Sequence, residues 1–195
     1  MALTQEQYLR AIKARRALAV ADCPATASKT MKTLSEAGWD GEYVVPNQLT
    51  SRSFSGPLIL LNNWFGWEEL EGLALKDRAD VKKLGYLPNI RTNLCLDRAL
   101  EIVGLTRQDI YVTQACVFLP PSTMGSSIAS AVYRVSVDRV LRHELGGRTP
   151  VALGDAAQKV CRSSGIDFVG AFHPSYQAGE RRAQEIAAAI GRVHG

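Results

Sequence analysis

The sequence predicts an α/β fold, a three-layer α/β/α sandwich in which helices cover both faces of a central four-stranded parallel sheet. Short apolar runs alternate along the chain with longer segments of helical spacing, which is the order of successive βαβ units. The clearest unit is Val151–Tyr176, in which Val151–Leu153 and Asp167–Ala171 flank a segment of helical spacing. Connections of this kind join parallel strands. Wholly apolar runs are typical of strands that are covered on both faces.

The first forty residues are expected to add two helices to this sandwich. Thr4–Val20 has amphipathic spacing, and Gln7 follows its first residue at the distance of a capping box. Ala25–Ala37 predicts a second helix, which ends before a glycine. Gly41–Gly56 is rich in turn-forming residues and predicts a loop that includes a short strand at Tyr43–Val45.

Strands and helices then alternate to the end of the chain. The apolar runs predict strands at Leu58–Leu61, Asp109–Thr113, Val151–Leu153 and Asp167–Ala171. Helical spacing predicts helices over part of Glu68–Lys83, over Leu94–Val103, from Ser126 or Ser127 to Leu145, and over Asp155–Arg162 and Gly179–Val193. No repeat or linker interrupts this pattern, so residues 1–195 are expected to form a single domain.

The composition is that of a globular protein with a basic surface. Apolar residues make up 46% of the chain and charged residues 22%, which is ordinary for a folded domain. The net charge of +4 suits a polyanionic partner. The apolar runs are too short to span a bilayer, and the first twenty residues lack the apolar core of a secretory signal. We therefore expect a cytoplasmic monomer that does not bind membranes.

The cysteines do not predict a metal site. Cys23, Cys95, Cys116 and Cys161 lie far apart in the sequence, and no two of them have the spacing of zinc or iron–sulfur ligands. Disulfides are unlikely in a cytoplasmic protein. We expect all four to be small core residues, and we expect neither a metal nor another cofactor.

Three of the four predicted strands end on a distinctive polar residue. Asn63 follows the first strand, Gln114 follows the second and His173 follows the fourth. In parallel sheets the carboxyl ends of the strands form one edge, where ligands bind. Each residue alone also has a structural explanation, as a turn asparagine, a strand-end amide or a hydrogen-bonded histidine. Together they predict a crevice in which an imidazole and two amides meet.

The motifs around these residues resemble those of the uracil-DNA glycosylase superfamily, from about Leu58 to Arg182. The segment VALGDAAQKVC, followed by GIDFVGAFHPSY, is similar to the family's strand–helix with a Leu-Gly-x-x-Ala pattern and its His-Pro-Ser motif. LDRALEIVGLTRQDIYVTQACVFLPPS resembles the family segment that ends in a pair of prolines. LILLNNWFG occupies the place of the family's first motif.

This resemblance implies a monofunctional DNA glycosylase that needs no metal. Such enzymes swing the target nucleotide out of the duplex, and water then cleaves the bond between base and sugar. By position in the motifs, His173 would stabilise the negative charge on the leaving base, and Asn63 would align the attacking water. Gln114 would face the Watson–Crick edge of the base. Further residues expected at the base are Asn62, Phe65 and Tyr86.

The resemblance also implies a set of contacts to DNA outside the base pocket. Ser175 would bind a phosphate, and the segment from Tyr176 to Arg182 would enter the gap that the extruded base leaves. The expected DNA-binding residues are Ser122, Ser175, Tyr176, Gln177, Arg181 and Arg182. The two arginines could instead be surface charges of the last helix.

Several positions differ from the family's pattern, among them Trp64, which replaces the proline of the first motif, and two of them bear on the chemistry. Asn63 stands where the most active branches have a carboxylate, and an amide cannot accept a proton at neutral pH. Gln114 stands where the family has Asn and is one methylene longer. The sequence therefore leaves two alternatives to a glycosylase for uracil or another deaminated base. One is a non-catalytic nucleic-acid-binding member of the same fold, and the other is an unrelated α/β hydrolase or transferase for small nucleotides.

Overall fold

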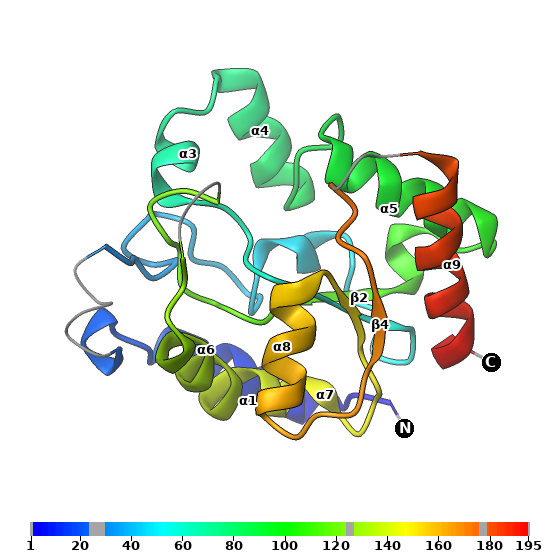
Figure 1. The fold of residues 1–195 in the computed structure, drawn as a ribbon. Coiled ribbons are helices and arrows are strands. Elements are labelled where there is room, and N and C mark those ends of the chain that lie inside the picture. The colour runs from blue at the N-terminus through cyan, green and yellow to red at the C-terminus, as the bar shows by residue number, and fades with distance from the viewer. Residues whose placement is uncertain (1, 24–29, 124–126, 176–178, 195) are drawn as a thin grey trace.

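Four short parallel strands form the centre of the molecule (Figure 1). The structure is a computed structural model, and it describes residues 2–23, 30–123, 127–175 and 179–194. The strands, in the order β2-β1-β3-β4 across the sheet, are β2 (Tyr111–Gln114), β1 (Leu58–Leu61), β3 (Val151–Leu153) and β4 (Val169–Ala171). All three pairings are parallel, so the sequence-based prediction of a four-stranded parallel sheet is confirmed.

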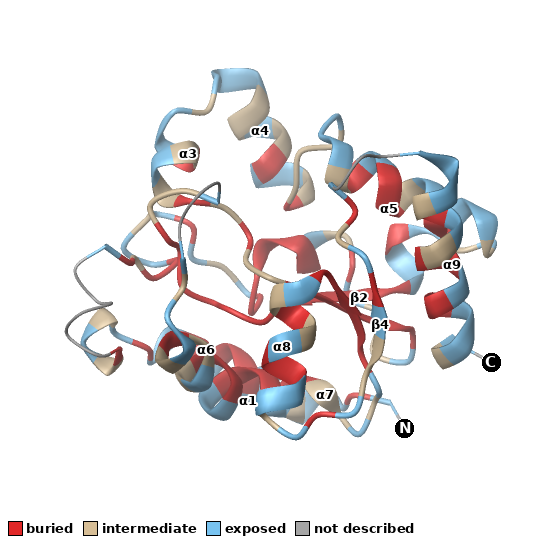
Figure 2. Cartoon of the chain, in the orientation of Figure 1, coloured by how far each residue is buried: buried red, intermediate tan, exposed pale blue. Residues whose placement is uncertain are grey.

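Helices cover both faces of the sheet, because successive residues of each strand point to opposite sides. Leu58 and Leu60 belong to one buried cluster, whereas Ile59 and Leu61 belong to another. The first face is covered by α1 (Gln5–Arg16), α6 (Ser130–Ser136), α7 (Arg142–Leu145) and α8 (Asp155–Ser163). The second face is covered by α5 (Arg91–Ile102) and α9 (Glu180–His194). Figure 2 shows the buried residues in the sheet and on the inner sides of these helices.

Several elements differ in length from those that the sequence predicts. The capping box of α1 is present, since the Thr4 hydroxyl accepts from the Gln7 backbone N–H at 3.2 Å, but the helix ends at Arg16. The segment Glu68–Lys83, predicted to be helical in part, lies in two helices, α3 (Trp67–Glu71) and α4 (Leu75–Leu84), which are separated at Gly72. The long helix that ends near Leu145 contains a π-helical turn, Val137–Leu141, between α6 and α7.

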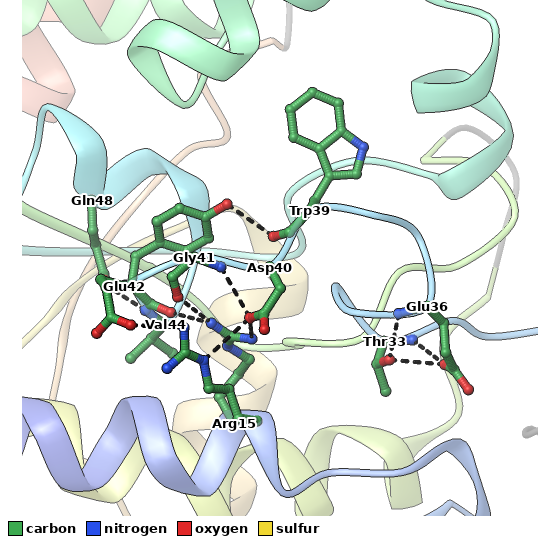
Figure 3. Close-up of polar contacts among 11 residues, drawn as sticks. Arg15, Thr33, Glu36, Trp39, Asp40, Gly41, Glu42, Val44 and Gln48 are labelled. Carbon is green, nitrogen blue, oxygen red and sulfur yellow. Dashed lines mark hydrogen bonds and ion pairs between the residues drawn. The ribbon is translucent and has the colours of Figure 1, made fainter.

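The predicted helix Ala25–Ala37 is wrong over the part that the structure describes. Residues 24–29 lie outside the described residues, and Lys32 is extended. Its backbone exchanges two hydrogen bonds with Leu119, of 2.9 and 2.8 Å. A single turn follows, in which a carboxylate oxygen of Glu36 accepts from the Thr33 backbone N–H and hydroxyl (Figure 3). Pairing with a distant segment thus prevails over the helical spacing, which is a local property.

The predicted strand Tyr43–Val45 is also wrong. Its central N–H, that of Val44, donates to the side-chain Oε1 of Gln48 at 2.9 Å instead of to a neighbouring strand (Figure 3). Gln48 lies on η2 (Pro46–Leu49), a short 3-10 helix. The segment is therefore an irregular loop, and a side chain of the following 3-10 helix accepts its central hydrogen bond.

Arg15 fastens this loop to α1 (Figure 3). Its buried guanidinium donates to the backbone oxygens of Gly41 and Tyr43 at 2.9 and 2.6 Å and forms an ion pair with Asp40. The hydrogen bond from Arg15 lowers the pKa of Asp40. These contacts connect the N-terminal helix to the segment that leads into the sheet.

The four cysteines are free and buried, as expected for core residues. Burial raises the pKa of Cys116 to about 12 and that of Cys161 to about 11, so both thiols are protonated at neutral pH. Over the described residues, no helix is both long enough and apolar enough to cross a bilayer.

Candidate functional site

A cavity of about 500 Å³ lies at the carboxyl edge of the sheet. All four strands supply residues to its wall, namely Asn63 after β1, Gln114 at the end of β2, Gly154 after β3 and His173 after β4. In the sheet order, the connection from β1 leads outward to β2, and the connection from β3 leads outward in the opposite direction to β4. A crevice forms between two such strands, at their carboxyl ends. The structure thus brings the three polar residues singled out in the sequence to one place, the strand-end cavity.

Hydrogen bonds within the cavity wall fix the side-chain amide of Asn63. Its Oδ1 accepts from Nδ2 of Asn62 at 2.9 Å, and Oδ1 of Asn62 accepts from the hydroxyl of Tyr133 at 2.5 Å. Asn63 Nδ2 is buried without a hydrogen-bond partner among the described residues. Asn63 therefore contributes an unused donor to the wall. Asn62, which the resemblance places at the base, also lines the cavity and holds its neighbour in position.

Gln114 contributes the complementary group. Its Nε2 donates to Oδ1 of Asn47 on η2 at 3.0 Å, whereas its Oε1 is buried and has no partner in the described structure. An unsatisfied buried polar atom costs about 1–3 kcal/mol. Both atoms are closed to solvent, so a ligand would recover that energy if the wall moved to admit a donor to Gln114 and an acceptor to Asn63. Asn47 could not be found from the sequence, because it lies in a short 3-10 helix that follows no strand.

His173 is held as a neutral imidazole with a defined tautomer. Burial lowers its pKa, so the ring is uncharged at neutral pH. The backbone N–H of Ser175 donates to His173 Nδ1 at 3.2 Å, and the Ser175 hydroxyl lies 2.7 Å from the same atom. An Nδ1 that accepts a hydrogen bond carries no proton, so the proton is on Nε2. His173 thus offers an N–H donor without a positive charge.

The absence of a side chain at Gly154 leaves space for the imidazole of His173. Its φ is +89°, and a Cβ added at this position would lie 2.8 Å from Cβ of His173. We expect Gly154→Ala to lower the free energy of unfolding by about 1–3 kcal/mol through backbone strain and to displace the imidazole. Urea denaturation and the NMR shifts of His173 measure the two effects. Gly191→Ala, at an open helical position on α9, is the matched control and is expected to stabilise by about 0.5–1 kcal/mol.

Two aromatic side chains at the cavity match those expected to stack on a base. Phe65 packs edge-on against Trp64, with ring centroids 5.0 Å apart, and Tyr86 lies beneath the guanidinium of Arg107 at 4.3 Å. Both line the cavity. Trp64 is buried and donates through its indole N–H to the Gly85 carbonyl at 2.8 Å, which is a structural role.

The expected DNA-binding residues are only partly assembled at the cavity. Ser175 lines it, but its backbone N–H and hydroxyl serve His173. The Ser122 hydroxyl donates to Glu69 at 3.1 Å. Arg182 pairs with Glu185 at 2.9 Å, and Arg181 is almost fully exposed. Neither arginine is among the residues that line the cavity. Tyr176 and Gln177 lie outside the described residues.

Two carboxylates, those of Glu69 and Asp155, are among the described residues that line the cavity, and they differ in their contacts. Glu69 accepts from the hydroxyls of Ser122 and Thr123 and from the backbone N–H of Gly66 and of Thr123. Burial raises its pKa, but these hydrogen bonds outweigh burial and the pKa is lowered overall. Asp155, the first residue of α8, is exposed and forms no ion pair within the described chain.

Behind the cavity, a fully buried carboxylate joins η2 to β2. Glu144 on α7 accepts from Nε2 of Gln48 at 2.8 Å and from the hydroxyls of Tyr111 and Thr113 at 2.6 and 2.7 Å. Gln48 adjoins Asn47, and Thr113 adjoins Gln114. Glu144 therefore fixes the two segments whose next residues form the Gln114–Asn47 pair.

The burial of Glu144 predicts a pH dependence of stability. Burial raises its pKa to about 7 from an ordinary value of 4.5, although hydrogen bonds from Tyr111, Thr113 and Gln48 lower it. Between these two pH values the folded state holds a proton that the unfolded state has released. We expect this group to stabilise the fold fully below pH 4.5 and to lose about 3 kcal/mol of that contribution as the pH rises through 7.

Urea denaturation of the native protein and of Glu144→Gln over this pH range tests the expectation. The glutamine does not titrate, and the hydroxyl that faces its new amide can turn and accept. The difference in unfolding free energy between the two proteins should change with pH in the stated direction. A constant difference would contradict the assignment.

Comparisons with known proteins neither add to nor overturn this picture. Neither the family models nor the curated proteins matched this chain. Among the described residues, no three His, Cys, Asp or Glu side chains gather in a way that could hold a metal ion.

Proposed function

We propose that this protein is a monofunctional DNA glycosylase that hydrolyses the bond between the sugar and uracil, or another deaminated base. The observation that carries the proposal is the composition of the strand-end cavity. A neutral imidazole with its proton on Nε2, an unpaired amide donor and an unpaired amide acceptor line one cavity. These groups suit an extruded base that presents both N–H and C=O groups and leaves as an anion.

The base is seated by Gln114 and an aromatic ring. The free Oε1 of Gln114 accepts from a ring N–H of the base, as deaminated bases carry next to a carbonyl. Its Nε2 is already bound to Asn47, so the orientation of the amide is set before the ligand enters. Phe65 or Tyr86 supplies the apolar face for the ring.

His173 and Asn63 then act on the reacting atoms. The bond between C1′ and the base nitrogen breaks, and its electron pair leaves with the base, where His173 Nε2–H stabilises the charge. Water forms the new bond to C1′. Asn63 Oδ1 has a second lone pair beside the one used by Asn62, and it accepts a hydrogen bond from that water. The water keeps one proton in the new hydroxyl on C1′ and releases the other to solvent, and the base anion takes up one proton from solvent, since an amide takes up no proton.

A base-release assay tests the proposal. Oligonucleotides that contain one uracil, hypoxanthine or xanthine, single- and double-stranded, are incubated with the protein and then treated with alkali. We expect strand cleavage at the modified position of at least one substrate and none in the unmodified oligonucleotide. The absence of cleavage in every substrate would refute glycosylase activity.

A second candidate function is a member of the same fold that binds nucleic acid without cleaving it. The supporting observation is that Asn63 is an amide and that Glu69 is engaged by four donors. This candidate predicts salt-dependent binding of the same oligonucleotides with no release of base.

A further inference from the structure

A second cavity adjoins the strand-end cavity. It has a volume of about 590 Å³ and lies between α6 and α8. Both cavities include Asn62 and Ala156 in their walls. Tyr133, which donates to Asn62, faces this second space. Asn62 and Ala156 therefore belong to a wall that the two cavities share.

The second cavity is basic. Arg134, Arg142 and Lys159 line it, against Asp138 as the one acidic residue of its described wall. Asp138 pairs with Arg142 at 3.3 Å. Arg134 and Lys159 form no ion pair with any described residue, so two positive charges face the cavity unneutralised. Ser127 and Ser130 add hydroxyl donors. We use the name basic cavity for this space.

We propose that the basic cavity binds a phosphate group of the nucleic-acid strand whose nucleotide occupies the strand-end cavity. Unpaired cations with neighbouring hydroxyls recognise a phosphate by charge-assisted hydrogen bonds. The shared wall favours a strand over a separate small anion, because a nucleotide beside Asn62 and Ala156 carries a phosphate within reach of the adjoining space. The inference rests on the proposed function only for which nucleotide occupies the strand-end cavity. The binding of a nucleic-acid strand does not depend on glycosylase activity.

The salt dependence of oligonucleotide binding tests this inference. A labelled single-stranded oligonucleotide that contains uracil is titrated with the native protein and with Arg134→Gln/Lys159→Gln at several salt concentrations. Each lost phosphate contact reduces the slope of log K against log salt by about 0.7 for a single strand. We expect the slope to fall by about 1.4 in the double variant, and affinity at low salt to fall at least tenfold.

A charge-matched control separates a local effect from the loss of net charge. Arg192 on α9 lies near Leu58 and Val169, the first residues of their strands, and so at the opposite edge of the sheet. Arg192→Gln is compared with the single variant Arg134→Gln. We expect only Arg134→Gln to reduce the slope. Equal slopes in both variants and in the native protein would overturn the inference.

Two further measurements distinguish a phosphate of the strand from a free phosphate ion, and test the glycosylase proposal separately from the phosphate site. If inorganic phosphate binds the native protein but not the double variant, while the oligonucleotide slope is unchanged, the cavity is a free-anion site and the inference is wrong. In the base-release assay the double variant should raise KM and leave kcat unchanged. If the native protein releases no base but the slope still falls as expected, the glycosylase proposal fails and the phosphate site stands.

Discussion

His173→Ala is expected to reduce the rate of base release by about 100- to 1,000-fold, the usual cost of removing one donor that stabilises a developing anion. The donor is the Nε2–H of a ring whose Nδ1 accepts from the Ser175 backbone. Alanine removes it and leaves no other imidazole at the cavity wall. Single-turnover measurement with the best substrate reports the change directly in the chemical step.

His143→Ala is the matched control for this prediction. His143 is exposed on α7 and does not line the strand-end cavity, so its removal should leave the rate unchanged. The circular dichroism of both variants should match that of the native protein. An undiminished rate in His173→Ala would exclude the role assigned to this residue.

Glu144→Ala is expected to have the largest effect on stability, a loss of about 3–5 kcal/mol. The substitution leaves the hydroxyls of Tyr111 and Thr113 without their shared acceptor, and it opens a void at a site that is completely buried. The amide of Gln48 keeps the Tyr111 hydroxyl and the Val112 carbonyl as acceptors. Each unsatisfied donor costs about 1–3 kcal/mol, and the void adds to that cost. Urea denaturation at pH 7 measures the loss.

Glu101→Ala serves as the control for Glu144→Ala. Glu101 is exposed near the end of α5 and pairs with Arg98 on the surface, and such pairs contribute about 0–1 kcal/mol. A loss in Glu144→Ala as small as that in the control would show that the buried hydrogen bonds contribute little to stability.

The sequence predicts the sheet and the edge at which three polar residues meet, for physical reasons that are local. A strand buried on both faces must be apolar throughout, as in Leu58–Leu61, and this pattern is visible in the residues alone. The carboxyl ends of parallel strands share an edge, so the meeting of Asn63, Gln114 and His173 at one cavity follows once the strands are known.

The partners of these residues could not be predicted in the same way. Asn47 reaches Gln114 from 67 positions away, and Tyr133 reaches Asn62 from 71 positions away. Neither residue ends a strand or belongs to a repeated pattern, and only the folded chain brings them close. The same reason explains why the prediction of a helix at Ala25–Ala37 is wrong over the residues that the structure describes, where the bridge between Lys32 and Leu119 depends on a segment far along the chain.

The π-helical turn between α6 and α7 sets the directions in which the side chains of this continuous helical segment project. The N–H of Arg142 donates to the carbonyl of Val137, five residues back, so the turn holds one residue more than an α-helical turn. In a continuous α-helix, Tyr133 and Glu144 would project within about 20° of each other, at about 100° per residue. The extra residue separates their directions by roughly a quarter of a revolution. If the same eleven steps were wound as a continuous α-helix, without the π-helical turn, both side chains would point the same way. The helix could then contribute either to the wall between the two cavities or to the buried interior, but not to both.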